Sequence, residues 1–271
     1  LEFRRVLFRS MMPKLTPLRT RALVLLTLAL VALVIGASVL VRQAEKDALS
    51  AGAEQGKTLA RAFAEHTLAN VRLIDYVLSD LAQDWSPEAP AVSRHLAVSH
   101  YISDISVQIS STDAKGRVNY SNLGMPTSVV DVSDREHIKV HLEGTAQGLF
   151  ISRPVKGRVS GKWSIQFSRA VIRNGRTAGV LVISVDPEYF ARFYESLSLK
   201  TGDVVTMVRN TGEILARFPA GTRYFGQVIS DAPYLDKASQ VQGTYRRLAM
   251  TDGVDRVYGW HRLPEYGLVL V

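Results

Sequence analysis

A run of twenty mostly apolar residues near the N-terminus limits the structures open to this chain. From Ala22 to Val41 the sequence has no charged residue, and Arg21 and Arg42 flank the run. Twenty helical residues at about 1.5 Å each span a hydrocarbon layer of about 30 Å. A signal peptide is the alternative, but its apolar segment has about 7 to 15 residues and a small-residue cleavage site follows it. We therefore predict a transmembrane helix at residues 22–41.

Charges on the two sides of this run predict its orientation. The charged side chains among residues 11–21 are all basic, whereas basic and acidic residues are mixed directly after Arg42. Because basic residues favour the cytoplasmic side, residues 11–21 are expected in the cytoplasm and residues 42–271 outside. The first ten residues, LEFRRVLFRS, precede a Met11-Met12 pair and resemble a non-native prefix, so they are left out of the fold prediction.

Composition excludes several classes of protein. The chain of 271 residues has no cysteine, which excludes disulfides and thiolate metal sites. Part of its net charge of +8 lies in the first 21 residues. The remaining surface is mildly basic without an aromatic-interleaved patch, so we expect no nucleic-acid partner.

Residues 42–85 are predicted to form a long helix that continues from the membrane span. Apolar residues recur there at spacings of three and four, and prolines at positions 87 and 90 end the pattern. This stripe is expected to pack on the chain's own sheet, and another face is expected to pair with a second copy in a homodimer. The stripe consists of Leu59, Phe63, Leu68, Val71, Ile74, Leu78 and Leu81.

Residues 86–198 are predicted to form a first antiparallel-sheet module. After a short helix near residues 92–100, a strand at 105–109 turns at Asp113-Ala114-Lys115-Gly116 into a strand at 117–120. The loop that follows is expected to lie over the sheet. Ser133 and Glu136 have the spacing of a capping box, which predicts a short helix starting near Ser133.

A hairpin and a helix complete this module. Trp163, Ile165 and Phe167 alternate with polar residues, and a second β-rich run at 179–185 follows the turn at 173–176. Asp186 before Pro187 predicts the N-cap and first position of a helix that reaches about residue 197.

Residues 199–271 are predicted to form a second, incomplete module. Strands are expected at 204–208 and 214–217 around the turn Asn210-Thr211-Gly212, and at 243–250 and 256–262 around Thr251-Asp252-Gly253. A further strand is expected at 266–271. The turn Asn210-Thr211-Gly212 forms a weak internal repeat with the turn Asp113-Ala114-Lys115-Gly116 of the first module. The predicted fold class is therefore α+β, with an N-terminal transmembrane helix, a long helix and two antiparallel-sheet modules, truncated at the C-terminus.

Three segments in this order carry a family resemblance: DVSDREHIKVH from Asp131, GLFISRPVKGRVSGKWSIQFSR from Gly148, and GVLVISVDPEYF from Gly179. Together they resemble the PAS-like double Cache sensor domain of bacterial membrane signalling proteins, most closely those with a GGDEF diguanylate cyclase output. The resemblance covers roughly residues 42–271. It implies a chain anchored in the bacterial inner membrane with its sensor domain in the periplasm, a second span beyond Val271, and a homodimer.

The same resemblance implies a ligand pocket in the first module, between the 120–130 loop and the helix near Ser133. Amino-acid receptors of this family carry an Arg followed two and three residues later by Trp and Tyr, and an Asp after a later strand. Arg135 and Asp186 match, but His137 and Ile138 do not. The expected partner is therefore a small polar or anionic metabolite, such as a carboxylate, with an amino acid as the alternative. The predicted ligand-binding residues are Arg135, Asp186, His137, His141, Trp163, Gln166, Ser168, Tyr120 and Tyr101.

Catalytic and metal chemistry are not expected in these residues. His137 and His141 are four apart on a predicted helix, but no third ligand accompanies them, and no GxSxG nucleophile motif occurs. We predict no catalytic residue, metal or cofactor. The expected function is the input region of a protein that controls a diguanylate cyclase. The alternatives are input to a histidine kinase or chemoreceptor, a dimerisation scaffold that binds nothing, or an envelope enzyme.

Overall fold

The computed structural model describes residues 17–85, 105–195, 199, 202–219, 221–236 and 240–271. The chain divides into two compact units, residues 1–52 and residues 53–271. The predicted non-native prefix, the helix near residues 92–100 and Tyr101 lie outside the described residues. The predicted membrane helix and the long helix after it belong to one continuous helix, α1 (Pro17–Asp84).

The N-terminal part of α1 has the features of a membrane helix. Among the described helices, α1 is long and apolar enough to cross a membrane, by length and composition. Its few polar side chains are satisfied within the helix, since the Thr27 hydroxyl donates to the Val24 carbonyl (2.8 Å) and the Ser38 hydroxyl to the Val34 carbonyl (2.7 Å). Such internal pairing is what a hydrocarbon environment requires of polar groups.

The first sheet has the strand order β2-β1-β6-β5-β3, and β4 also pairs with β5. All of these pairs are antiparallel. The predicted strand boundaries agree to within a few residues. The strands are β1 (Ser106–Asp113), β2 (Val118–Ser121), β3 (Phe150–Ile151), β4 (Val155–Lys156), β5 (Trp163–Arg173) and β6 (Arg176–Val185).

The β5–β6 hairpin forms where the sequence predicts it. Its two turn residues, Asn174 (φ 52°) and Gly175 (φ 72°), both adopt the left-handed conformation that a tight two-residue hairpin needs. Helix α5 (Pro187–Glu195) follows β6. Asp186 caps it as predicted, because its Oδ1 accepts the backbone N–H of Glu188 at 2.9 Å.

The second sheet repeats the arrangement of the first. Its order is β8-β7-β11-β10-β9. The β7–β8 hairpin lies beside β11, as the β1–β2 hairpin lies beside β6 in the first sheet. The final strand begins at Leu268, two residues later than predicted, because a 3-10 turn, η3 (Pro264–Tyr266), precedes it. Two further 3-10 turns, η1 (Thr222–Tyr224) and η2 (Pro233–Leu235), follow β8. The strands are β7 (Val205–Arg209), β8 (Ile214–Phe218), β9 (Gln242–Leu248), β10 (Asp255–Leu263) and β11 (Leu268–Leu270).

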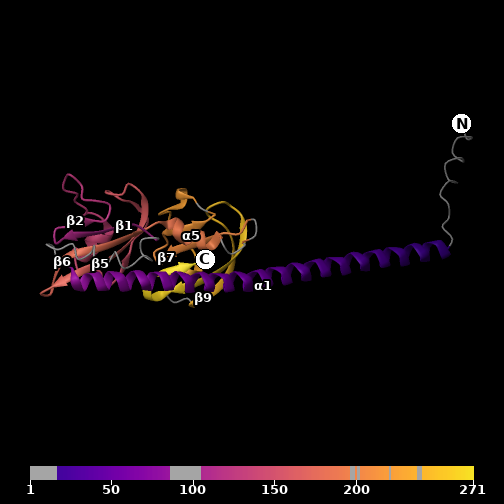
Figure 1. Cartoon of the computed structure of the whole chain (residues 1–271). Coiled ribbons are helices and arrows are strands. Elements are labelled where there is room, and N and C mark those ends of the chain that lie inside the picture. Colours follow the sequence, from indigo (N-terminus) through magenta and orange to yellow (C-terminus); the bar gives the residue numbers. More distant parts are fainter. Residues whose placement is uncertain (1–16, 86–104, 196–198, 200–201, 220, 237–239) are drawn as a thin grey trace, which may run out of the picture. The chain divides into compact units, whose positions relative to one another are not determined.

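One hydrophobic core joins both sheets to the C-terminal part of α1, which runs beside them in Figure 1. Phe63, Val71, Ile74, Leu78 and Leu81 are buried in this core, and Leu59 and Leu68 are partly buried against it. The predicted packing of the stripe on the chain's own sheets is therefore confirmed. The strands contribute one face of each sheet, with Ile109, Phe167 and Ile183 from the first and Met207, Leu215 and Leu270 from the second.

Two arginines of β5 fix the end of α1 to the first sheet. The Arg173 guanidinium donates to the carbonyls of Ala82, Gln83 and Trp85 at 2.8–2.9 Å, which satisfies groups that a helix end leaves unpaired. Arg169 pairs with Asp75 at 2.5 Å.

The short helix of the first module does not have the predicted capping box. Helix α4 (Glu136–Leu142) begins three residues after Ser133, and Arg135 is its N-cap. The Ser133 hydroxyl instead donates to Asp131 Oδ1 at 2.7 Å, and Glu136 pairs with Arg209 of β7 at 3.1 Å. The Ser133 hydroxyl thus stabilises the local turn at Asp131 and does not cap the helix, since a serine side chain can take either role.

Candidate functional site

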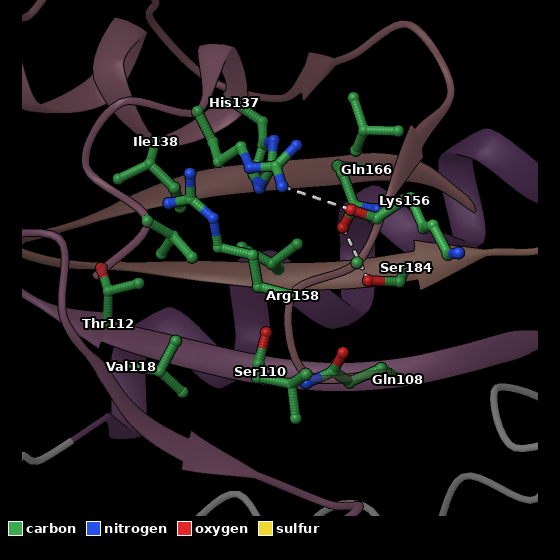
Figure 2. Close-up of a pocket in the computed structure, with 16 residues that line it drawn as sticks. Gln108, Ser110, Thr112, Val118, His137, Ile138, Lys156, Arg158, Gln166 and Ser184 are labelled. Atoms are coloured by element: carbon green, nitrogen blue, oxygen red, sulfur yellow. Dashed lines mark hydrogen bonds between the residues drawn. The ribbon is translucent and has the colours of Figure 1, made fainter. Parts of the chain in front are cut away.

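The face of the first sheet that points away from α1 carries polar side chains beside the buried Val180 and Val182, and it forms the floor of a pocket. Gln108 on β1, Ser184 on β6 and Gln166 on β5 are direct neighbours across the sheet. They alternate along their strands with residues of the core, so their side chains lie on the opposite face. Ser110 and Thr112 continue this floor along β1 (Figure 2).

The opposite side of the pocket comes from the start of α4 and from β4 with the turn after it. Arg135, His137 and Ile138 belong to the first, and residues 155–159 to the second. One hydrogen bond joins the two, from Arg135 Nη2 to the Lys156 carbonyl at 3.4 Å. The pocket has a volume of about 40 Å³, which is room for about three waters or a ligand of a few non-hydrogen atoms.

The charges that line this pocket are all positive. Arg135, Lys156 and Arg158 line it, and none of the described lining residues is acidic. Arg158 is held in place from outside the pocket, because Asp134 accepts two hydrogen bonds from its guanidinium at 2.6 and 2.8 Å. This bidentate pair lowers the pKa of Asp134, so the carboxylate stays ionised. The remaining two cations favour an anionic ligand.

His137 contributes a neutral polar group to the pocket. Its side chain is only 7% exposed, and its Nδ1 is buried without a hydrogen-bond partner in the described part of the chain. Burial, reinforced by the positive charge of Arg135, lowers the pKa of His137 to about 3. A buried unpaired polar atom is costly. A ligand that pairs with this nitrogen would remove that cost.

Of the nine predicted ligand-binding residues, three line the pocket: Arg135, His137 and Gln166. Gln166 is oriented by its neighbours, since its Oε1 accepts a hydrogen bond from Ser184 (2.6 Å) and its Nε2 donates to Ser164 (2.8 Å). His141 and Ser168 are buried and pair with each other at 3.0 Å, but they do not line the pocket.

The other predicted residues lie elsewhere. Asp186 serves as the α5 cap and does not line the pocket. Trp163 is 43% exposed and contacts Phe225 of the second module edge to face. Tyr120 packs against the core, where burial raises its pKa, and Tyr101 is outside the described residues.

The predicted roof of the pocket also differs. The loop after Tyr120 was expected to cover the pocket, but none of its residues before Val132 lines it. Leu123, Met125 and Val129 of this loop are exposed. The segment 155–159 takes that place, because β4 pairs with the start of β5 and so holds the following turn near the sheet.

Several lining residues were absent from the predicted set. They are Gln108, Ser110, Thr112, Lys156, Arg158 and Ser184. A usable signal exists in β1, where polar residues at 108, 110 and 112 alternate with Val107 and Ile109. Such a polar face on a strand whose other face is buried indicates that this face meets solvent or a ligand.

No group of three or more His, Asp or Glu side chains that could hold a metal ion occurs in the described ranges. His137 and His141, despite their spacing of four, point to different surroundings, one to the pocket and the other to Ser168. The pocket therefore offers hydrogen bonds and positive charge as its means of binding.

Comparison with known proteins identifies the class of domain. Residues 187–271 match a family model described as dCache_1_like, a histidine kinase sensor domain. No curated protein sequence matches the chain.

Solved structures extend this similarity to most of the chain. The extracellular domain of a candidate histidine kinase, rpHK1S-Z16, is 25% identical with a TM-score of 0.71, over 80% of this chain and 91% of that one. The ligand-binding domain of the Pseudomonas fluorescens chemoreceptor CtaA, in complex with L-isoleucine, is 17% identical with a TM-score of 0.58, over 84% and 93%. That of the Pseudomonas aeruginosa chemoreceptor PctC, in complex with GABA, is 18% identical with a TM-score of 0.55, over 80% and 95%.

The long helix, the two matched sheets and these similarities show that this chain carries a double Cache sensor domain. The family model describes a sensor domain, and two of the similar structures are ligand-binding domains. The names of these proteins include histidine kinases and chemoreceptors, and none is a diguanylate cyclase.

Proposed function

We propose that this chain is the extracytoplasmic input region of a membrane-bound signalling protein and that its first sheet binds a small, polar organic anion. The observation that carries the proposal is the chemistry of the pocket. Arg135 and Lys156, neither of them in an ion pair among the described residues, line the same pocket as His137, whose buried Nδ1 has no hydrogen-bond partner there. A hydroxycarboxylate or a short dicarboxylate supplies both a negative charge for the cations and a hydrogen bond for His137.

An amino acid fits this pocket less well. The chemoreceptors CtaA and PctC are complexed with L-isoleucine and GABA, and both ligands carry an ammonium group. An ammonium needs an acceptor, preferably a carboxylate, and none of the described lining residues is acidic. Asp186 does not line this pocket, and its Oδ1 accepts the Glu188 N–H.

The proposed topology places residues 22–41 across the inner membrane, residues 11–21 in the cytoplasm and residues 42–271 outside. The apolar N-terminal part of α1 supports this arrangement. A homodimer along α1 is part of the proposal, and Tyr76, which is 71% exposed on the helix, is available for such a contact. The ligand would act by favouring one of two arrangements of the sensor, to the extent of its differential affinity.

The proposed output is a histidine kinase. The matched family model is a histidine kinase sensor domain, and the structure of rpHK1S-Z16 is the extracellular domain of a candidate histidine kinase. A chemoreceptor is the second candidate, supported by the structures of CtaA and PctC. The expected diguanylate cyclase gains no support from these similarities. The gene sequence downstream of Val271 tests the output. A helix with a phosphoacceptor histidine would support a kinase, whereas a long heptad hairpin or a GGDEF segment would contradict it.

A thermal-shift screen of the chain in detergent micelles tests the ligand class. Amino acids, amines, hydroxycarboxylates and dicarboxylates form the panel, and a ligand at about 100 times its Kd stabilises the folded state by about 2.7 kcal/mol. We expect shifts with the carboxylates that disappear in Arg135→Ala. Arg153→Ala removes an exposed arginine outside the pocket and is the matched control. An amino-acid shift that is lost in Asp186→Ala and kept in Arg135→Ala would contradict the proposal.

A further inference from the structure

The second sheet has a pocket of its own, on the same face as the pocket of the first. It has a volume of about 50 Å³ and is lined by residues of β7, β8, β9 and β10 and of the loops beside them. The Arg209 N–H donates to the Glu213 carbonyl at the β7–β8 turn, and the Asp113 N–H donates to the Arg117 carbonyl at the β1–β2 turn. Thr206 lies three residues before Arg209, and Ser110 lies three residues before Asp113. The two positions are equivalent, and each lines its pocket.

A buried arginine dominates this second pocket. The Arg217 side chain is 8% exposed, and its guanidinium lies over the Tyr224 ring at 4.6 Å. Its polar contacts are long: Nη1 donates to Thr206 Oγ1 at 3.3 Å, and Nη2 to Asp252 Oδ2 at 3.5 Å. A charge-assisted hydrogen bond normally measures about 2.7–2.9 Å. The charge of Arg217 is therefore poorly compensated for a group that is nine-tenths buried.

The neighbouring acids are already engaged. Asp252 accepts a short hydrogen bond from Arg256 Nη1 at 2.6 Å, and Asp231 accepts from Arg247 through both its backbone carbonyl and its carboxylate. Three guanidinium groups thus share two carboxylates around this pocket. A bound anion would supply the missing negative charge.

Apart from Thr206, Arg247 and Thr251, the remaining walls are apolar and aromatic. The rings of Tyr245 and Tyr258 stack at 4.7 Å, and Tyr234 lies 6.1 Å from Tyr245. Ala232 and Met250 also line the space. These walls differ from the hydroxyl and amide floor of the first pocket, so the two pockets favour different ligands.

We propose that the second sheet holds a separate binding site for a short-chain alkyl monocarboxylate. The carboxylate pairs with the two Nη groups of Arg217 in a bidentate contact, and the alkyl group packs against the tyrosine wall. The volume limits the ligand to a few non-hydrogen atoms, as in acetate, propionate or butyrate. This site is independent of the proposed ligand of the first sheet.

Calorimetric titration of the whole chain in detergent micelles with acetate, propionate and butyrate tests the site. The titrations are run on Arg135→Ala, so that the first pocket is impaired, and on the same chain with Arg217→Gln. Loss of a charge-assisted contact should weaken binding about tenfold or more. Arg246→Gln is the matched control, because Arg246 is next to Arg247 on β9 and does not line this pocket.

A second variant keeps the test decisive if Arg217→Gln folds poorly. Ala232→Leu leaves the arginine in place and fills the pocket, so it should also abolish binding. Binding that is lost in Arg217→Gln and Ala232→Leu but kept in Arg246→Gln supports the site. No heat with any of the three acids at about 10 mM, well above a millimolar Kd, overturns it. Binding that survives both pocket variants overturns it as well. Neither result bears on the first pocket, which is tested separately with Arg135 intact.

Discussion

The two sheets of this sensor share a strand order and a core, but their free faces differ in chemistry. The free face of the first carries amides and hydroxyls, together with Val180 and Val182, beneath two arginines and a lysine. That of the second carries three tyrosines around one buried arginine. The faces toward α1 are apolar in both. Shared topology thus constrains the residues that meet the helix, and the residues on the other face are free to specify a ligand.

Truncation of a residue in the shared core should cause the largest loss of stability. Phe167 in the first sheet and Met207 in the second are both buried in it. Truncation to alanine should cost about 3–5 kcal/mol for Phe167→Ala and about 2–5 for Met207→Ala. Because one core joins both sheets, each variant should shift a single denaturation transition. Urea unfolding followed by tryptophan emission checks this, with Trp85 packed on the first sheet and Trp260 in the second. Two separate transitions would show that the sheets are independent.

Close backbone contact between α1 and the second sheet provides the next test. A Cβ on Gly259 would overlap the backbone of Gly56 and Lys57, so Gly259→Ala must push β10 from the helix. Overpacking of this kind typically costs about 1–3 kcal/mol. Gly52→Ala, a helical glycine with open space around it, is the control and should stabilise the chain by about 1 kcal/mol. Equal melting temperatures for the two variants would refute this contact.

Acid should destabilise the domain because His137, in the pocket of the first sheet, is buried as a neutral group. The pKa of His137 falls to about 3 on folding, from 6.5 in the unfolded chain. Between these values the unfolded chain binds one more proton, so stability is full above pH 6.5 and falls as the pH drops. From pH 7 to pH 5 the loss from this residue is about 2 kcal/mol.

The variant His137→Gln keeps a polar side chain that does not titrate in this range, so it should have a shallower pH dependence. Its slope stays above zero because burial also lowers the pKa of His141, His66 and His261. Chemical denaturation at several pH values measures both proteins. An unchanged slope in His137→Gln would mean that His137 is not buried as a neutral group.

The smallest effect concerns Asp186. Loss of its cap should cost about 1 kcal/mol in Asp186→Ala. The affinity of the first pocket should not change, because Asp186 does not line it. Melting curves with and without a ligand separate the two effects. A large loss of affinity would return Asp186 to the binding site.

The sequence allowed most of the fold to be predicted, because alternation and turn residues are local signals. The β5–β6 hairpin and the Asp186 cap are examples. The pocket was less accessible, because Arg158 and Lys156 reach it through the pairing of β4 with β5, a contact that no local pattern reveals. The capping box at Ser133 failed for a related reason, since Asp131 offers Ser133 a competing partner.

A crystal structure of the chain grown with the best carboxylate of the thermal-shift screen would test the central claim most directly. The account predicts ligand density between Arg135 and the floor formed by Gln108, Gln166 and Ser184, with a ligand atom within hydrogen-bond distance of His137 Nδ1. Density against Asp186, or an empty pocket at saturating ligand, would contradict it.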